Sequence, residues 1–362
     1  MPNAEKTRYN YIDILKTYAV FMMIIGHTLD AILAPAVKSL GAYQSFIVFR
    51  GLTSASFFIA SGSGLFFAFQ SKRGIPGFTL LTQRVAKILP ILFAGYFLHL
   101  PYFSATRLLF HSTAADWRQL MQCDTLQNIC YSIIILQIIM VTGQKRFRIF
   151  LAALVMMILI LGLTPIIHAR LTKPMIPVQL FTHHYGSLFP LFPFAAYIFC
   201  GAVLAFILSA LREKNGFRLV RKYFLGTGLF IFGVSFFLKL TVLQLFFFRI
   251  GAIMALIGFL TYAEGRTGKF ISFFQAIGKE SLVIYLIHLM IVYGSVINSG
   301  FRQLFGGKLS APAGLSVALG FAAVMIGLGW AWNRLKCAQP RMARIGRNAL
   351  IALLVAFFIL KP

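Results

Sequence analysis

The chain has 362 residues, of which 59% are hydrophobic, and its mean hydropathy is +0.83. A water-soluble protein could not bury this much apolar side chain, so the composition excludes the soluble classes and predicts an integral membrane protein. The net charge of +26 would indicate nucleic-acid binding in a soluble chain. Here the basic residues cluster in short segments between apolar stretches, which is typical of a multi-spanning protein, and we expect no nucleic-acid partner.

Apolar stretches recur along the whole chain, and a helix that crosses a bilayer needs about 20 residues. By that criterion we predict an all-α, polytopic membrane bundle of about 10–11 transmembrane helices. Residues 1–362 then form a single transmembrane domain, in which the last helix, 347–361, is a candidate accessory element. The predicted spans are 12–34, 48–70, 86–105, 126–143, 147–167, 188–211, 221–239, 242–262, 281–299, 313–334 and 347–361.

Prolines and short turns modify three of these spans. Pro90 and Pro101 interrupt the third span, and two prolines in 188–201 predict a kinked entry to the sixth. The very short connection 239–241 predicts that the seventh and eighth spans form a helical hairpin.

The connecting segments alternate between strongly and weakly basic. The strongly basic set contains Lys6, Arg8, Lys72, Arg73, Arg84, Lys87, Lys145, Arg146, Arg148, Arg212, Lys214, Arg218, Arg221, Lys222, Arg266, Lys269, Lys279, Arg334, Lys336, Arg341, Arg344 and Arg347. The positive-inside rule places this set in the cytoplasm, so the N-terminus is inside and, with eleven spans, the C-terminus is outside. Two outer segments of about 20 residues, 105–125 and 168–187, are then candidate lids or partial re-entrant pieces, with His168, His183 and His184 on or near the outer face.

The first span carries four ionisable residues, Asp13, Lys16, His27 and Asp30. Each such group costs at least ~2.5–3.5 kcal/mol inside a membrane helix, so these residues usually face a protein interior or a wet cavity. A lone His on an apolar face is more often structural than catalytic. Lys16 and His27, however, are eleven residues apart, about three turns or ~16 Å, on the same side of the helix. We therefore favour a functional role for both.

Two stretches near the second and third spans carry small or basic residues. Residues 57–66 contain Ser61 with Gly62, Ser63 and Gly64, and close helix contact is the simpler interpretation of the glycines. Arg84 and Lys87 lie three residues apart at the predicted cytoplasmic border. They could extend to anionic headgroups or bind phosphate, and the sequence leaves both interpretations open.

Three later features also carry polar groups. Asp124 and Gln127 open the fourth span, where an acid is most often an N-cap. Tyr285 and His288 are buried three residues apart in 276–293, with Gly278 and Ser281 near the expected helix entry. His288 needs a polar partner, from Tyr285 or from a neighbouring span. Arg249 inside the eighth span should meet an acid or line a polar cavity.

Together these stretches resemble the membrane-embedded acyltransferases of the acyltransferase-3 and heparan-α-glucosaminide N-acetyltransferase type. Ile12-Asp13-Ile14-Leu15-Lys16, followed after ten residues by His27, keeps the family's first-helix frame, with Lys16 where Arg is usual. The segments FFIASGSG (57–64), QRVAKILP (83–90, with Gln83 for the first Arg) and IGKESLVIYLIH (277–288) are similar to three further family segments. DTLQ (124–127) and FPLFPF (189–194) are closer to the glucosaminide branch.

This resemblance implies transfer of an acyl group, usually acetyl, from cytoplasmic acyl-CoA to a hydroxyl or amine of a periplasmic or surface glycan. His27 would act as general base or carry the acyl group itself. Lys16, paired with Asp13, would orient the donor, and Asp124 or Asp30 would fix the imidazole tautomer. Arg84 and Lys87 would contact the phosphates of acetyl-CoA.

The resemblance further implies a lipid-embedded enzyme of the bacterial cytoplasmic (inner) membrane. We expect no metal cofactor, since the four cysteines lack metal-ligand spacing. The alternative from another class is a transporter or flippase whose intramembrane polar residues line a substrate path. A transporter would leave its substrate unmodified and would need no acyl-CoA.

Overall fold

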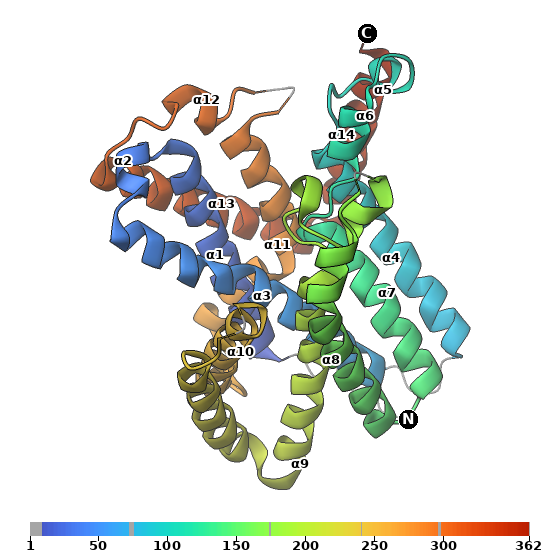
Figure 1. Ribbon diagram of the computed structural model, residues 1–362, viewed down its shortest axis with the longest axis vertical. Helices are drawn as coiled ribbons and strands as arrows, with labels where there is room; N and C mark the ends of the chain where they lie inside the picture. Colours follow the sequence, from blue (N-terminus) through green and yellow to red (C-terminus); the bar gives the residue numbers. More distant parts are fainter. Residues whose placement is uncertain (1–8, 72–75, 174, 240, 296–297, 362) are drawn as a thin grey trace. The chain divides into compact units, whose positions relative to one another are not determined.

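The computed structural model describes residues 9–71, 76–173, 175–239, 241–295 and 298–361. Within these ranges the regular structure is helical, and the one β-type contact is an isolated bridge between Leu33 and Leu309 (Figure 1). Ten of the described helices are long and apolar enough to cross a membrane. The predicted all-α polytopic bundle is confirmed, because a backbone in lipid must satisfy its polar groups inside helices. Lys6, Arg8, Lys72 and Arg73 of the basic set lie outside the described residues.

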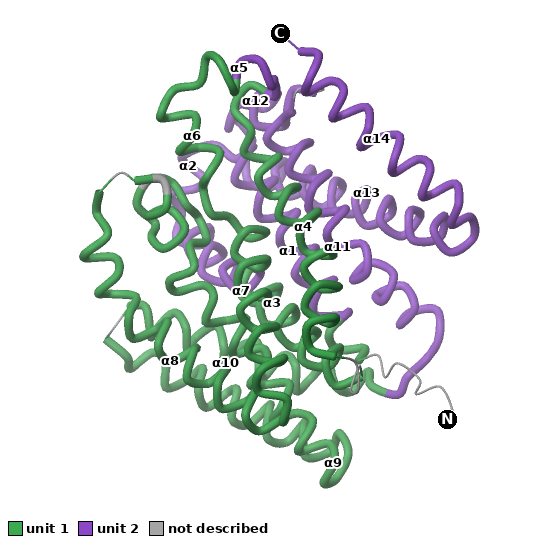
Figure 2. Tube along the Cα trace, turned by 90° about the vertical axis from the view of Figure 1, so that its right-hand side faces the viewer, with its two compact units in different colours: residues 1–12, 54–102, 108–264 green, residues 13–53, 103–107, 265–362 purple. Residues whose placement is uncertain are grey.

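The chain forms two compact units, coloured separately in Figure 2. Unit 1 comprises Met1–Ile12, Ser54–Tyr102 and Leu108–Glu264, and unit 2 comprises Asp13–Thr53, Phe103–Arg107 and Gly265–Pro362. Helices α1 (Asn10–Ile32), α3 (Gly41–Gln70) and α5 (Ala105–Phe110) each contribute residues to both units.

Unit 1 is built around a long helical segment, α9 (Leu191–Ser235), against which α7, α8 and α10 pack. Helix α4 pairs with α7. The other elements of this unit are α4 (Gly77–Leu98), α6 (Ala114–Leu120), α7 (Thr125–Gly143), α8 (Arg146–Arg170), η1 (Ile176–Leu180), η2 (His184–Gly186), α10 (Thr241–Leu260) and η3 (Thr261–Ala263).

Helix α9 contains two of the predicted spans. It has 45 residues, more than twice the length that a bilayer crossing needs. The helix is broken at Asn215 (φ −153°, ψ 37°) and Gly216 (φ 58°, ψ −155°), where glycine tolerates the positive φ. Phe192 also leaves helical geometry (φ −101°, ψ 117°), which agrees with the predicted kink at the entry.

Glycines bring the helices of unit 1 into close contact. A Cβ atom on Gly228 would lie 2.4 Å from the Ala255 nitrogen, and one on Gly251 would lie 2.4 Å from the Phe232 nitrogen. The second part of α9 and α10 therefore form the predicted hairpin with touching backbones. In the same way, a Cβ on Gly62 of α3 would lie 2.0 Å from the Ile198 oxygen, so the small residues of 57–66 serve helix packing there.

Unit 2 contains the greater part of α1, α2 (Pro35–Lys38), the first part of α3, α11 (Lys269–Tyr293), α12 (Phe301–Phe305), α13 (Ala311–Ala338) and α14 (Pro340–Leu360). Helices α11 and α13 are joined by a buried ion pair. The Glu280 carboxylate, 1% exposed, accepts from Lys336 Nζ at 2.5 Å and from Asn333 Nδ2 at 2.9 Å. These donors satisfy a charge that would otherwise be costly to bury.

Several predicted spans start later than the helices that contain them, and the differences are largest for α4 and α11. Helix α4 begins at Gly77 rather than 86 and continues through Pro90, ending before Pro101. Helix α11 begins at Lys269, so Gly278 and Ser281 lie well inside it rather than at its entry. Hydropathy marks only the most apolar part of a helix, whereas these helices extend beyond it through segments that contain polar and charged residues. Gly278 has a packing role instead, since its Cβ would lie 2.8 Å from the Asp13 oxygen.

Candidate active site

Helix α1 is continuous from Asn10 to Ile32, so the predicted offset of about three turns between Lys16 and His27 holds. Asp13 is buried, whereas Lys16 and His27 are half-buried. The Asp13 end of α1 packs on α11 through Gly278, and Thr17 Oγ1 donates to the Phe274 carbonyl at 3.0 Å. The ion pair between Asp13 and Lys16 stays a prediction.

A pair of histidines joins α1 to α11 within unit 2. His27 Nδ1 lies 3.0 Å from His288 Nε2, and the two rings are nearly parallel, with an interplanar angle of 12°. His288 Nδ1 lies 3.0 Å from the Ile284 carbonyl oxygen one turn earlier on α11. His288 is fully buried, and His27 and the Ile284 carbonyl are the polar partners that the sequence required for it.

These contacts assign the proton on each ring when both imidazoles are neutral. A carbonyl oxygen can only accept, so His288 carries its proton on Nδ1 and leaves Nε2 as an acceptor. His27 must then donate from its own Nδ1 to His288 Nε2. The lone pair of His27 is therefore on Nε2, the nitrogen opposite the contact with His288. A neutral imidazole held in this tautomer can accept a proton.

Two tyrosines of α11 surround the histidine pair. The Tyr293 ring centroid lies 5.8 Å from that of His27, and the Tyr285 ring lies 5.8 Å from His288 in an edge-on arrangement. The sequence left Tyr285 or a residue of a neighbouring span as the possible partner of His288; the Tyr285 side chain contacts the ring, and His27 of a neighbouring span forms the side-chain hydrogen bond. Such edge-on packing limits rotation of the His288 ring.

Asp30, one turn beyond His27, forms an ion pair with Arg50 of α3, and Arg50 Nη1 also donates to the Gly26 carbonyl at 3.1 Å. Tyr43 Oη donates to Asp30 Oδ1 at 2.6 Å. The Asp30 partners in this cluster are thus Arg50 and Tyr43, whereas the His27 Nδ1 atom meets His288. Arg50 and Tyr43 were not predicted as site residues. A guanidinium within an apolar stretch was the available signal for Arg50.

In unit 1, Asp124 is the N-cap of α7, and it forms a capping box with Gln127. Its carboxylate accepts from the Thr125 backbone N–H at 2.7 Å and lies 3.6 Å from His99 Nε2. Gln127 is fully buried, and its Oε1 accepts from the Asp124 backbone N–H at 3.3 Å. The prediction that Asp124 is an N-cap is therefore confirmed, and this residue also lies close to His99.

Arg84 and Lys87 line the same small pocket, together with Ala68, Phe69, Leu80, Gln83 and Gln137. Their spacing thus puts them on one face of α4. The volume of this pocket is only about 10 Å³, so a ligand as large as a nucleotide would not fit inside it. Such a ligand would lie across the rim that Arg84 and Lys87 form. Both cations lie in the N-terminal half of α4, where they can supply charge for a phosphate group.

Two further candidate residues, Ser61 and Arg249, lie on packed helices of unit 1. Ser61 is half-buried on α3, and the neighbouring Ser63 donates from Oγ to the Gly201 carbonyl at 2.8 Å. Arg249 meets a hydroxyl, Tyr197 Oη, at 3.4 Å. Within the described ranges Arg249 forms no ion pair, so the expected acid is not found.

The outer histidines gather where α8 ends and η2 begins. The His183 ring centroid lies 5.4 Å from that of His168, and the His184 ring lies 6.3 Å from His168. His183 Nδ1 is 3.3 Å from the Ser187 carbonyl. Burial lowers the pKa of His183, and the two neighbouring histidines lower it further.

The family model described as an acyltransferase domain matches residues 9–332, which is most of the chain. The match includes α1, the His27–His288 pair, the Arg84–Lys87 rim and the Asp124 cap, whereas α14 lies outside it. No curated protein matches the chain.

Proposed function

The chain belongs to the acyltransferase-3 family, and we propose that this membrane acyltransferase takes its acyl group from a cytoplasmic acyl-CoA, with acetyl-CoA as the donor. The proposed acceptor is a hydroxyl or amine of a glycan on the opposite side of a bacterial inner membrane. The observation that carries the proposal is the hydrogen-bonded sequence from the Ile284 carbonyl through His288 to His27.

In the proposed reaction His27 is the general base. Its Nε2 lone pair takes the proton of the acceptor hydroxyl or amine as that oxygen or nitrogen attacks the thioester carbonyl carbon. The new C–O or C–N bond forms, the C–S bond breaks, and the CoA thiolate leaves and takes up the proton that His27 Nε2 received, which restores the neutral base. His288 Nε2 accepts from His27 Nδ1 throughout, so it orients the base and shares the positive charge that develops on it.

The donor phosphates are proposed to lie against α4. Arg84 and Lys87 offer two cations on one face of α4, and phosphate groups form their strongest hydrogen bonds with such charged donors. Lys16 faces the same side of α1 as His27, three turns away, and would stabilise the part of the donor that approaches the base. Asp13, buried one turn before Lys16, would fix the position of this ammonium group.

The test is transfer of radiolabelled acetyl from acetyl-CoA to a glycan fraction by the protein in proteoliposomes. We expect His27→Ala and His27→Gln to lose about 10²–10⁴-fold in rate, the range for removal of a general base. His111→Ala is the matched control, because this exposed histidine lies outside the cluster and should leave the rate unchanged. Full activity of both His27 variants would contradict the mechanism.

A second measurement separates donor binding from chemistry. Acetyl-CoA binding to the detergent-solubilised protein should weaken in the Arg84→Ala, Lys87→Ala double variant and persist in His27→Ala. Saturable binding that is unchanged in the double variant would move the donor site. If the wild-type protein neither binds acetyl-CoA nor modifies a glycan, the proposed donor and acceptor are wrong.

A further inference from the structure

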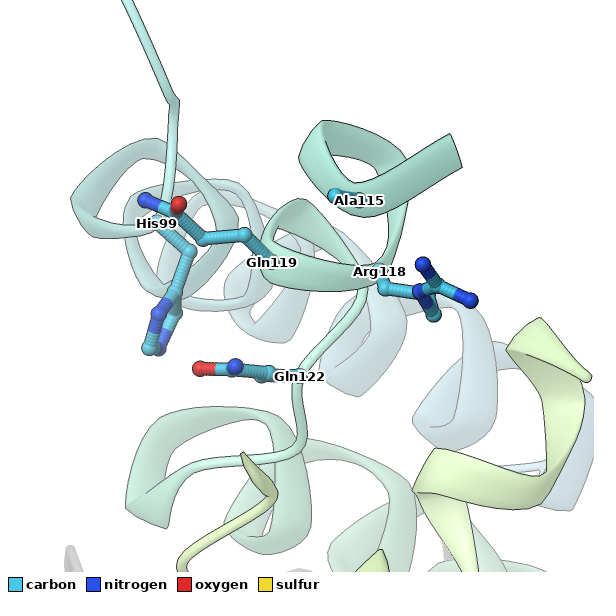
Figure 3. A pocket seen from close by; sticks show the side chains of 5 residues that line it. All are labelled: His99, Ala115, Arg118, Gln119 and Gln122. Atoms are coloured by element: carbon cyan, nitrogen blue, oxygen red, sulfur yellow. The ribbon is translucent and has the colours of Figure 1, made fainter. Parts of the chain in front are cut away.

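An open pocket of about 630 Å³ lies in unit 1 where α4 ends and α6 leads into α7. It is lined by His99, Ala115, Arg118, Gln119 and Gln122 (Figure 3). The volume falls within the range of small-molecule sites, roughly 300–1,000 Å³. None of these residues takes part in the reaction proposed above.

Four of the five lining residues carry hydrogen-bonding side chains. Within the described ranges, the side chains of Arg118, Gln119 and Gln122 make no hydrogen bond or ion pair with the protein. In Figure 3 the Gln122 amide is directed toward His99, whereas Arg118 extends from α6 in the opposite direction. Each glutamine offers two donors and one acceptor, which is the set that neighbouring hydroxyl groups require.

Neighbouring residues contact the side chains of His99 and Gln122 on the side away from the pocket. Asp124 Oδ2 lies 3.6 Å from His99 Nε2 and so orients the ring. The Gln122 amide fits against Gly186, whose φ is +96°, because a Cβ atom there would lie 2.5 Å from Gln122 Nε2. Beneath the same cap, the Nε2 atom of the fully buried Gln127 has no hydrogen-bond partner within the described residues. Polar side chains thus continue from the pocket into the protein.

The charge of the pocket favours an anion. Arg118 is the one permanently charged group in its lining, and the two nearby acids, Asp116 and Asp124, lie behind the lining in helix caps, Asp124 beside His99. Asp116 accepts from the Thr113 backbone N–H and hydroxyl, and Asp124 caps α7. Hydrogen bonds from Thr113 lower the pKa of Asp116, so this acid stays ionised and committed to its helix cap.

We propose that this pocket binds an anionic saccharide. Arg118 pairs with a carboxylate of the ligand, and His99, Gln119 and Gln122 bond its hydroxyl groups. That the ligand is the acyl acceptor rests on the proposed function, whereas binding itself does not.

The test uses trigalacturonic acid and its uncharged counterpart, α-1,4-linked galactotriose, with the full-length protein in detergent and no acyl-CoA present. Isothermal titration should show saturable binding of the acid. Arg118→Gln should weaken binding of the acid at least 10-fold and leave the uncharged sugar unchanged. Gln119→Ala should weaken both sugars about 2–10-fold, the range of one neutral hydrogen bond. Arg170→Gln, at the exposed end of α8, is the matched charge control and should have no effect.

Each outcome decides one part of the proposal. The site is overturned if neither sugar shows saturable binding. It is also overturned if neither Arg118→Gln nor Gln119→Ala changes the binding. Equal binding of both sugars with no effect of Arg118→Gln overturns the anionic ligand. His27→Ala should bind trigalacturonic acid normally, so a failed transfer assay and an absent binding site are distinguishable.

Discussion

At the scale of single residues, a backbone carbonyl determines which nitrogen of His27, the proposed base, carries the lone pair. The Ile284 carbonyl fixes the proton on His288, and His288 fixes the proton on His27. A carboxylate is the more familiar partner for a catalytic imidazole. Here a second neutral imidazole occupies that place, so the histidine pair carries no fixed negative charge in its own hydrogen bonds.

Substitution of His288 tests this positioning role. We expect His288→Leu to lower the transfer rate about 10–100-fold, as loss of an orienting partner usually does. His288→Gln should recover part of the rate, because a glutamine oxygen can accept from His27 Nδ1. Acetyl-CoA binding should be unchanged in both variants. Equal loss in the two variants, with a lowered melting temperature, would indicate a purely structural role for His288.

At the scale of elements, the glycines of α3 are not equivalent. Gly62 touches the backbone of α9, since its Cβ would lie 2.0 Å from the Ile198 oxygen, whereas a Cβ on Gly64 would meet nothing within 4 Å. Two positions in the same span can therefore have opposite responses to the same substitution.

Alanine at these two positions is a matched comparison. Gly62→Ala should lower the free energy of unfolding by about 1–3 kcal/mol, because backbone atoms cannot move aside as a flexible side chain can. Gly64→Ala should be neutral or stabilising by up to ~1 kcal/mol, from helix propensity. Unfolding by titration with dodecyl sulfate measures both values. Similar losses in the two variants would contradict the packing found here.

The segment around His183 should be sensitive to acid. Its pKa is lowered in the folded protein, so the unfolded chain binds the proton first as the pH falls. The contribution of His183 to stability is complete above about pH 6.5 and is lost below it. The groups that face the ring are His168, His184, the Ser187 carbonyl and the Phe194 ring.

Melting temperatures between pH 7.5 and 5 measure this effect. The wild-type protein should lose stability on acidification, and His183→Gln should lose less of it. His111→Gln, at an exposed position, should follow the wild-type curve. Parallel curves for His183→Gln and the wild type would show that His183 is not the titrating group.

At the scale of the whole chain, the break in α9 predicts eleven crossings, because ten described helices are long and apolar enough to span and α9 has two parts. With the N-terminus inside, as the positive-inside rule predicts, we expect the end of α14 outside. Within unit 2, Ser104 Oγ donates to the Lys361 carbonyl at 2.7 Å, so the residue after α14 contacts the segment 103–107.

Cysteine labelling in intact cells tests the orientation. Lys361→Cys should react with a membrane-impermeant maleimide added from outside. The native Cys337 is an internal control, because it is exposed in the last turn of α13, just before α14 begins, and should react only in inverted vesicles. Labelling of both cysteines from the same side would contradict the crossing count.

Local pattern alone determined much of this protein. The apolar spans, the basic segments between them, the α9–α10 hairpin and the cap at Asp124 all depend on residues close together in sequence, because helix formation and bilayer crossing are set by composition over about 20 residues. The Lys16–His27 frame is of the same kind, since a helix fixes that spacing. The family segments, read in order along the chain, indicated the acyltransferase-3 family.

Tertiary structure decided which polar groups meet. His27 and His288 are separated by 261 positions, and Asp30 and Arg50 lie on different helices, so no spacing rule could pair them. The sequence offered Asp30 and Asp124 as partners for His27, and the structure brings a second imidazole to its Nδ1 atom. The pocket at His99 was likewise beyond prediction, because its lining comes from the ends of separate helices. Helix periodicity is local, whereas partner choice depends on how distant helices pack.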